Sequence, residues 1–364
     1  MEKNELYLLY GQDPVQMAYE LAEKAGLDRL IGDPQRRVGL KPNLVLASPA
    51  ENGATTHPGL LEGLIRYLHE RGYFNLCILE GSWVGARTRE AFRLCGYEEL
   101  SARTGVPLLD TQADGFREYD CQGLPIRICD SAMALDFLIN LPVIKGHCQT
   151  YLTCALKNLK GLVPNAEKRR FHSLGLHKPI AHLNAKLRQD FILADGIWGD
   201  LNFEEGGNPV PAGRALAGRD PVLVDSYACS LLGLALSEVP YISLAQSLGV
   251  GCADLAQAVL RELNRPEALP PAQRQGRLVR QLARKVCAKE ACSACYAALI
   301  HALEKLDGEG ALARLPDPLC IGQGFRGQSD RAGVGIGNCC AGFTRKLPGC
   351  PPTALQIRDF LRGL

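Results

Sequence analysis

Up to about residue 265, short apolar runs alternate with amphipathic stretches, and this alternation constrains the fold more than any other feature of the chain. The runs have the length of buried strands, and the stretches between them repeat their apolar residues at helical spacing. Strands that alternate with helices build a mainly parallel sheet, because each helix carries the chain back across the sheet. We therefore predict an α/β domain over residues 1–265, with a large mainly parallel sheet and helices on both faces.

The predicted elements follow directly from this pattern. The strands are predicted at Leu6–Tyr10, Val38–Leu46, Leu76–Glu80, Leu124–Cys129, Leu135–Leu141 and Phe191–Asp195. The helices are predicted at Pro14–Ala25, Pro58–Arg71, Arg87–Leu94, Thr150–Lys160, Pro179–Arg188 and Pro221–Leu232. The stretch 265–275 is rich in proline and polar residues, which predicts a linker and a small C-terminal domain over residues 276–364.

Charge and apolar content limit the classes of partner. With 41 basic and 39 acidic residues the formal net charge is +2, so no overall field attracts nucleic acid or an anionic membrane, and we expect neither as a partner. A charged ligand must then be held by a local cluster. The chain has no apolar run of membrane-spanning length, and its start, MEKNELYLLYGQDPV, lacks the pattern of a signal peptide. These features predict a cytoplasmic protein.

Fifteen cysteines are unusual in such a chain, since thiols in a reducing compartment serve metals or catalysis more often than disulfides. Eight are scattered singly among apolar residues, where we expect small core side chains: Cys77, Cys95, Cys121, Cys129, Cys148, Cys154, Cys229 and Cys252. The other seven lie within about the last eighty residues, at short spacings and near glycines: Cys287, Cys292, Cys295, Cys320, Cys339, Cys340 and Cys350. This density predicts a metal site.

The CxxC motif Cys292–Cys295 directly precedes an apolar-periodic helix, so both thiols lie at a helix N-terminus, where free amides and the helix dipole favour thiolate. Zinc, an iron–sulfur cluster and a dithiol redox pair all fit a CxxC motif. Two turns rich in glycine or proline carry further thiols, at Cys339–Cys340 and at Cys350. Together with the CxxC motif they can supply four ligands.

Two other metal sites compete with this arrangement. Cys287, Cys292 and Cys295 have the C-x4-C-x2-C spacing of plant-type [2Fe–2S] proteins, with Cys320 as a fourth ligand. That spacing normally lies on an irregular loop, whereas here a long helix begins directly after Cys295. A zinc site is the second alternative, although no histidine lies near the CxxC motif at zinc-finger spacing.

Four C-terminal segments resemble one branch of the domain of unknown function family 362 (DUF362), whose members are described as iron–sulfur-centre proteins. The segments are CSACYAAL at 292–299, IGQG at 321–324, GNC at 337–339 and GCPPTALQIRDFL at 349–361. The resemblance covers nearly the whole chain. It implies a [4Fe–4S] cluster on Cys292, Cys295, Cys339 and Cys350, with Cys340 as the substitute for Cys339, because the doublet departs from the single cysteine of the family.

Polar residues follow the predicted strands of the large domain. Lys41 and Asn43 end one strand, His57 precedes a helix that begins at Pro58, and Glu80 closes the next strand. Ligands bind at the carboxyl ends of strands in open α/β sheets, so we expect these side chains to meet in one crevice.

Further along the chain, Lys145 and His147 follow another apolar run, and Lys157, Asn158 and Lys160 follow on a predicted helix. Lys157 and Lys160 are three residues apart, so on one helix face they could clamp an anion. The corresponding DUF362 signatures are KPN, THP, EG, KxH and KNLKG, found here at 41–43, 56–58, 80–81, 145–147 and 157–161. The resemblance gives these positions but no reaction, and for each residue a cap or an ion pair is the alternative.

The leading interpretation is an iron–sulfur oxidoreductase that passes electrons between the C-terminal cluster and a small anionic substrate. The candidate catalytic residues are His57, Glu80, Lys145 and His147, and the candidate anion-binding residues are Lys41, Asn43, Lys157, Asn158 and Lys160. Because neither a GxGxxG after a strand nor a P-loop is present, we expect an external electron carrier such as a ferredoxin. The alternatives are a cluster-holding electron-transfer protein without turnover, and a racemase or lyase with a structural cluster.

Overall fold

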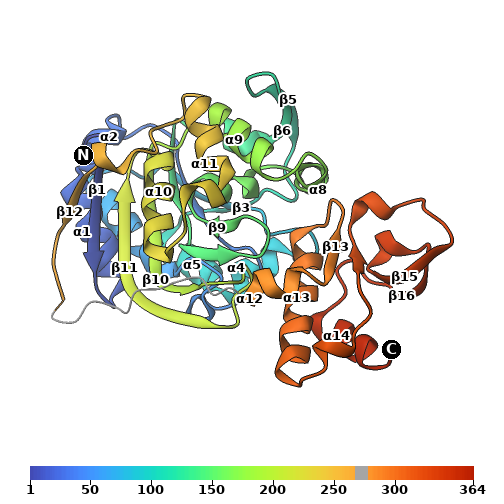
Figure 1. The fold of residues 1–364 in the computed structure, drawn as a ribbon. Coiled ribbons are helices and arrows are strands. Elements are labelled where there is room, and N and C mark those ends of the chain that lie inside the picture. Colours follow the sequence, from blue (N-terminus) through green and yellow to red (C-terminus); the bar gives the residue numbers. More distant parts are fainter. Residues whose placement is uncertain (267–277) are drawn as a thin grey trace. The chain divides into compact units, whose positions relative to one another are not determined.

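The computed structural model describes residues 1–266 and 278–364, and these form two units. Among the described residues, the first unit comprises 1–168 and 177–266, and the second comprises 169–176 and 278–364. Each unit has a sheet of its own (Figure 1). Most of the predicted linker, which we placed at 265–275, lies outside the described residues.

The large sheet of the first unit contains eight strands. In spatial order they are β12 (Val259–Glu262), β1 (Glu5–Tyr10), β11 (Pro209–Gly218), β10 (Phe191–Asp200), β7 (Phe137–Leu141), β2 (Val38–Pro42), β3 (Leu76–Glu80) and β4 (Leu108–Asp110). Only β11 runs against its two neighbours, and the other strand pairs are parallel. The prediction of a large mainly parallel sheet is therefore confirmed.

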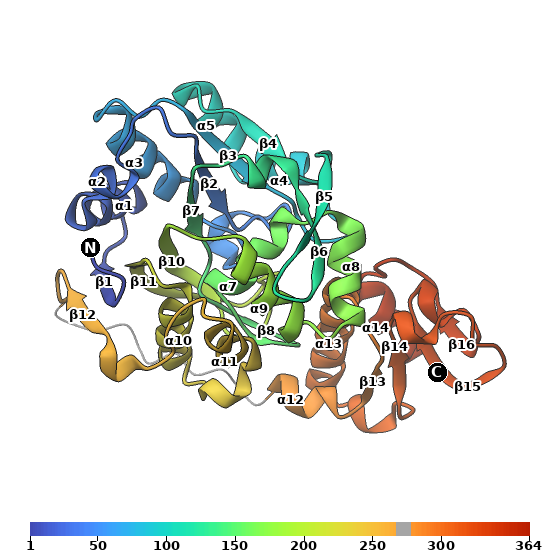
Figure 2. The same cartoon turned by 90° about the horizontal axis from the view of Figure 1, so that it is seen from above.

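Helices cover both faces of this sheet (Figure 2). On one face α1 (Pro14–Ala25), α3 (Pro58–His69) and α5 (Tyr97–Thr104) share a hydrophobic core with alternate residues of the strands. The opposite face carries α7 (Ala155–Asn158), which accepts a hydrogen bond from Asn140 of β7, and α10 (Pro221–Leu232), which packs on β11. The further helices are α2 (Leu27–Ile31), α4 (Thr88–Leu94), α6 (Asp130–Met133), α8 (Asn165–Ser173), α9 (His177–Lys186) and α11 (Pro240–Ser247).

Local chemistry explains why several helices begin where predicted. Proline occupies the first turn of α1 and α10, where its missing N–H would have no intrahelical partner. Asp13 and Asp220 cap these helices by accepting hydrogen bonds from backbone amides of the first turn. Gly26 and Gly233 then end them in the left-handed conformation.

Two predicted elements differ from the structure. The predicted helix at Thr150–Lys160 begins instead as strand β9 (Tyr151–Thr153), which pairs with β8 (Lys145–His147), and α7 starts only at Ala155. The buried carboxylate of Asp225 accepts hydrogen bonds from the Ala155 and Leu156 amides, which sets this later start. The predicted strand near Leu124 exists as β6 (Pro125–Cys129), but it forms a hairpin with β5 (Phe116–Asp120) outside the large sheet.

The second unit has a parallel sheet of four strands. They are β13 (Val286–Ala288), β14 (Leu319–Ile321), β15 (Arg331–Ile336) and β16 (Phe343–Leu347), in that spatial order. Its helices after residue 278 are α12 (Leu278–Ala283), α13 (Ser293–Gly308) and α14 (Ala354–Arg362). α13 and α14 pack together, with Ile357 and Leu361 buried.

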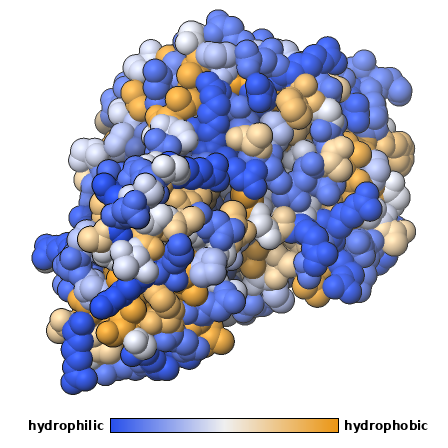
Figure 3. Space-filling view, turned by 90° about the vertical axis from the view of Figure 1, so that its right-hand side faces the viewer, coloured by the Kyte–Doolittle hydropathy of each residue, from blue (hydrophilic) through white to orange (hydrophobic). Residues whose placement is uncertain are grey.

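The molecular surface mixes residue types. On the face shown in Figure 3, hydrophobic residues occur in scattered groups between hydrophilic ones. Among the described residues, no helix has both the length and the apolar content needed to cross a bilayer.

Candidate functional site

The first candidate site lies at the carboxyl ends of β2 and β3, two adjacent parallel strands. Lys41 of β2 and Glu80 of β3 form a buried ion pair, with Nζ 2.8 Å from Oε2. The Glu80 carboxylate also accepts hydrogen bonds from the backbone amides of Leu44 and Gly81. Burial lowers the pKa of Lys41, and the negative charge of Glu80 opposes that shift.

Amide side chains connect this ion pair to the rest of the site. Asn158 of α7 accepts a hydrogen bond from Asn43 at 2.9 Å and donates one to Asn140 at 2.7 Å. Asn43 in turn accepts a hydrogen bond from Lys145 Nζ at 3.0 Å. Residues from β2, β7, β8 and α7 thus form one continuous buried network, as expected when strand ends meet at one edge of a sheet.

Lys145 is fully buried, and the three groups that its ammonium contacts are neutral. Nζ donates to the Asn43 side chain and to the backbone carbonyls of Ala54 and Glu204. Burial lowers the pKa of Lys145 to about 7, partly opposed by the charge of Glu204. The pKa of Lys145 therefore lies far below that of an exposed lysine.

Glu204 contacts two further residues of the network, Lys157 and His147. Its carboxylate bonds Lys157 Nζ and lies 2.9 Å from His147 Nε2. Burial alone would raise the pKa of Glu204, but Lys157 and His147 outweigh burial and hold the pKa well below its usual range. Glu204 therefore remains ionised and anchors both residues.

His147 is held in one orientation by the backbone. Its Nδ1 accepts hydrogen bonds from the Gln149 and Thr150 amides, so the ring hydrogen is assigned to Nε2, which faces Glu204. Burial and the charge of Lys157 lower the pKa of His147 to about 4. The ring is neutral at pH 7 with both nitrogens engaged, so His147 positions Glu204. A proton-exchanging role for His147 stays a prediction.

Two of the predicted site residues, His57 and Lys160, lie at the edge of this network. His57 caps α3, since its Nδ1 accepts a hydrogen bond from the Gly59 amide, and its Nε2 lies 3.6 Å from Glu51. The His57 side chain is one quarter exposed. Lys157 lies in α7 and Lys160 in the following 3-10 turn, Leu159–Leu162, and the charges of both lysines lower the pKa of His147.

Three participants were absent from the sequence prediction: Glu204, Lys168 and Asn140. Lys168 donates to the carbonyls of Gly81 and Ser82 at 3.0 and 2.9 Å, and burial lowers its pKa to about 8. The one available signal for Glu204 was the doublet Glu204–Glu205 before two glycines. For Lys168 and Asn140 the sequence pattern held no comparable signal.

Gly161, the last residue of the KNLKG motif, lies against the Lys41–Glu80 pair. A Cβ atom at this position would lie 2.8 Å from Lys41 Nζ and closer still to Glu80 Oε1. Any side chain here would displace the ion pair. The motif therefore ends in glycine for a steric reason.

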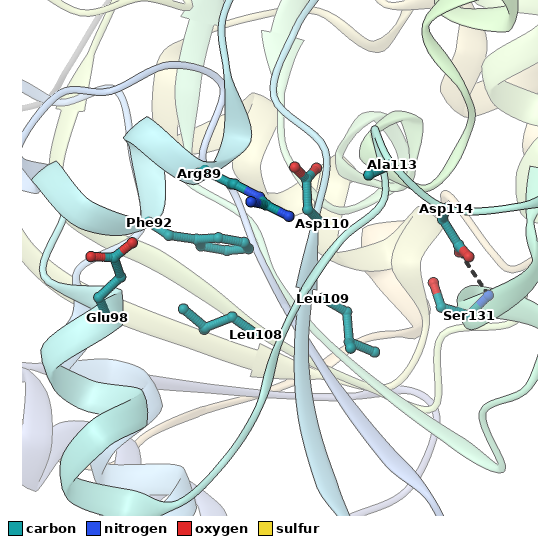
Figure 4. Close-up of a pocket in the computed structure, with 9 residues that line it drawn as sticks. All are labelled: Arg89, Phe92, Glu98, Leu108, Leu109, Asp110, Ala113, Asp114 and Ser131. Carbon is teal, nitrogen blue, oxygen red and sulfur yellow. Dashed lines mark hydrogen bonds between the residues drawn. The ribbon is translucent and has the colours of Figure 1, made fainter.

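A pocket of about 510 Å³ lies elsewhere in this unit, beside the edge strand β4 (Figure 4). Arg89, Phe92 and Asp110 project toward it, and Asp114 accepts a hydrogen bond from the Ser131 amide at 2.9 Å. None of the residues that line it belongs to the predicted site.

The second candidate site belongs to the C-terminal unit and is built from three segments. Cys292 is the N-cap residue of α13, and Cys295 lies in the first turn of that helix. Cys339 lies in a 3-10 turn after β15, and Cys350 follows β16. The two turns are tied together, since the Asn338 amide donates to the Gly349 carbonyl and the Gly349 amide donates to the Asn338 side chain.

The four thiols lie within electrostatic reach of one another. Burial, followed by the thiols of Cys292, Cys350 and Cys339, raises the pKa of Cys295 to about 12. Arg326 donates a hydrogen bond from Nε to Cys339 Sγ at 3.3 Å. Without a metal, Cys295 therefore stays protonated, and a bound cation would reverse this by replacing the proton.

The adjacent cysteines Cys339 and Cys340 have different surroundings. Cys340 is fully buried in a small core with Phe325 and Phe343, and its thiol donates to the Cys320 carbonyl at 3.5 Å. Cys339 is partly exposed and contacts Arg326. Of the doublet, Cys339 is the residue better placed to serve as a ligand.

Within the described residues, no three Cys, His, Asp or Glu side chains converge in a way that would hold a single metal ion. A four-iron cubane makes a different demand, because each thiolate binds its own iron and the four sulfurs surround the cluster. Four cysteines, two of them at a helix N-terminus and one hydrogen-bonded to arginine, are a donor set that fits such a cluster.

Comparison with known proteins places the large unit in a family. The family model described as "Domain of unknown function (DUF362)" matches residues 38–230, which include the whole polar network. The chain belongs to the DUF362 family. A thylakoid-associated protein of Synechocystis sp., sll1697, is 24% identical over 224 residues, which cover 60% of this DUF362 chain and 69% of that protein.

Two solved structures match the chain at low identity and low structural similarity. The lactate racemase apoprotein from Thermoanaerobacterium thermosaccharolyticum is 15% identical with a TM-score of 0.44, covering 64% of this chain. A protein from Thermotoga maritima is 16% identical with a TM-score of 0.36, covering 70% of this chain. The DUF362 chain spans only 57% and 62% of the length of these two proteins.

Proposed function

We propose that this DUF362 protein is an iron–sulfur redox protein whose C-terminal unit holds a [4Fe–4S] cluster on Cys292, Cys295, Cys339 and Cys350. The observation that carries the proposal is the gathering of four cysteines from three segments around Cys295. Thiolates repel one another, so such a group is stable only when it is protonated or bound to a cation. A cluster of this type supplies one-electron transfer.

The electron carrier that we propose is an acidic protein such as a ferredoxin. Arg326 beside Cys339 is exposed, as are Lys289 and Arg331, which lie over the ring of Phe325. Arg326 contacts Cys339 directly, so one of these charges lies at the site itself. Charges of one sign around a redox centre favour encounter with a carrier of the opposite sign.

The substrate that we propose for the large unit is a small anion at the carboxyl edge of the sheet. Four buried lysines lie in or beside the network: Lys41 and Lys157 pair with Glu80 and Glu204, whereas Lys145 and Lys168 donate to neutral groups. This excess of basic groups favours an anion nearby. His57 is the partly exposed histidine beside the network, and we propose that it exchanges protons with the substrate.

The first experiment analyses the metal content of protein purified without oxygen. Iron and acid-labile sulfide should each be present at about four per chain, as a four-thiolate cubane requires. Zinc without sulfide under the same conditions would overturn the cluster proposal. Two irons and two sulfides would instead support the [2Fe–2S] alternative.

A second experiment tests the anion site separately from the cluster. Lys145→Met keeps the apolar stem and removes the charge, so it should weaken binding of phosphate and small carboxylates in calorimetry while the cluster spectrum is unchanged. Lys24→Met, an exposed lysine of α1, is the matched control. Equal anion binding in wild type and both variants would remove the substrate site from the proposal and leave the cluster.

One observation favours a second candidate, an electron-transfer protein without substrate turnover. The network residues already bond one another, and Gly161 closes against the Lys41–Glu80 pair. A network completed by its own chain needs no ligand. The absence of anion binding in the preceding experiment would support this candidate.

A further inference from the structure

Two cysteines of the C-terminal unit, Cys287 and Cys320, lie outside the proposed ligand set. They are directly paired in the parallel ladder of β13 and β14, so their side chains leave the same face of the sheet at the same level. The Cys287 side chain packs against the small core that contains Cys320, and the Cys287 thiol raises the pKa of Cys320. Two thiols from separate strands therefore lie side by side.

The surroundings give the two thiols different roles. Cys320 is buried beside Phe325 and Phe343, whereas Cys287 is partly exposed. Burial raises the pKa of Cys320, and the nearby cations Arg331 and Lys289 oppose that shift. Cys287 is thus the accessible thiol, and Cys320 is the thiol behind it.

We propose that Cys287 and Cys320 form a reversible disulfide, a two-electron dithiol site distinct from the cluster cysteines. Adjacent strands are about 4.8 Å apart, which lies within the range of about 4.4–6.8 Å between the Cα atoms of disulfide-bonded cysteines. The pair therefore needs rotation about its side-chain bonds and little backbone movement. This proposal requires only the two thiols and does not rest on the presence of a cluster.

The oxidant is a small disulfide, and the exchange proceeds in two steps. The Cys287 thiolate attacks one sulfur of oxidised glutathione, forms a mixed disulfide and releases one glutathione thiolate. The Cys320 thiolate then attacks the Cys287 sulfur and releases the second glutathione thiolate. Two protein thiols lose two protons and two electrons, and one glutathione disulfide becomes two thiols.

The test uses the full-length protein purified without oxygen and treated with oxidised glutathione. Free thiols are alkylated with iodoacetamide, and the peptides are mapped by mass spectrometry. A peptide pair joined through Cys287 and Cys320, released by dithiothreitol, is expected. Recovery of both cysteines in alkylated form, or a disulfide between other cysteines only, would overturn the proposal.

Variants test the order of attack. Cys320→Ser should trap one glutathione on Cys287, and Cys287→Ser should leave Cys320 unmodified, since the accessible thiol is missing. Cys252→Ser, in the large unit, is the matched control and should retain the disulfide. Iron and sulfide are measured for each protein, because loss of iron in Cys320→Ser would make Cys320 a cluster ligand and overturn the dithiol. If Cys320→Ser does not fold, Cys320→Ala replaces it, and the wild-type map decides by itself.

Discussion

The polar network of the large unit and the cysteine site of the C-terminal unit differ in how their charges are balanced. In the network, lysines meet glutamates and carbonyl oxygens of the same chain, as in the Lys41–Glu80 and Lys157–Glu204 pairs. In the cysteine site, several thiols gather, and burial together with the neighbouring thiols raises the pKa of Cys295 to about 12. The difference indicates that two ion pairs within the chain balance much of the charge of the network, whereas the cysteine site gathers thiols that a metal, as we propose, would hold together.

The largest expected effect concerns the cysteine site. Cys350→Ala should abolish the cluster, because a four-thiolate cubane loses a covalent ligand. Absorbance near 400 nm, about the region where iron–sulfur charge transfer occurs, and iron analysis measure the loss. Cys320→Ala is the control and should retain the cluster. The reverse result, with Cys320 essential and Cys350 dispensable, would show that the plant-type ligand set is correct.

In the network, removing one partner should cost much of the stability of the large unit. Glu204→Gln leaves Lys157 and His147 without their anion, and breaking a buried ion pair in this way costs about 3–5 kcal/mol. Both tryptophans, Trp83 and Trp198, lie in this unit, so fluorescence-detected urea unfolding reports its stability.

The control for this change is Glu62→Gln, which breaks a partly exposed pair with Arg103 and should cost about 0–1 kcal/mol. The pKa of Glu204 is lower in the folded protein than its usual value, so its stabilisation is present above the usual carboxyl pKa and is lost as the pH falls toward the folded pKa. The acid sensitivity of unfolding should be weaker in Glu204→Gln. Equal loss in the two variants would show that the network is not the stabilising element.

A smaller loss of stability is expected from a substitution at Gly161, where the backbone lies against the network. Gly161→Ala places a methyl group against Glu80 and Lys41, and such overpacking costs about 1–3 kcal/mol. Gly308→Ala, at the end of α13 with open space around its Cβ position, should change stability by about 0.5 kcal/mol or less. If the two substitutions change the free energy of unfolding in urea by the same amount, a methyl group at Gly161 does not clash with the ion pair.

The smallest expected effect is a change in how the stability of the large unit depends on pH. The pKa of Lys145 is about 7 in the folded protein and near 10.5 when exposed, so the unfolded chain binds more protons between these values and stability rises with pH across that window. Lys145→Met removes this contribution and should make the rise shallower in unfolding measured at pH 7 and pH 9. Lys24→Met should keep the wild-type slope, and an unchanged slope in Lys145→Met would contradict the buried, perturbed lysine.

Part of both regions is determined by the sequence alone. The alternation of apolar runs with amphipathic stretches predicted the mainly parallel sheet, because strand and helix periodicities are local properties of the chain. The positions of Lys41 and Glu80 after apolar runs predicted that they would meet, since parallel strands end at one edge. The position of Cys292 and Cys295 at a helix N-terminus also followed from the local pattern.

The partners of these residues were decided by the tertiary structure. Glu204 lies 47 residues from Lys157, and their pairing depends on how the loop after β10 returns to α7, which no local pattern specifies. We expected a helix where β9 lies. The helix α7 begins only at Ala155, whose amide donates to Asp225, and local sequence could not show this contact because Asp225 lies 70 residues further along the chain. The different surroundings of Cys339 and Cys340 likewise depend on the packing of Phe325 and Phe343 around one of two adjacent thiols. Local periodicity sets which elements form, but burial and long-range contacts set which charges are paired and which thiols are buried or accessible.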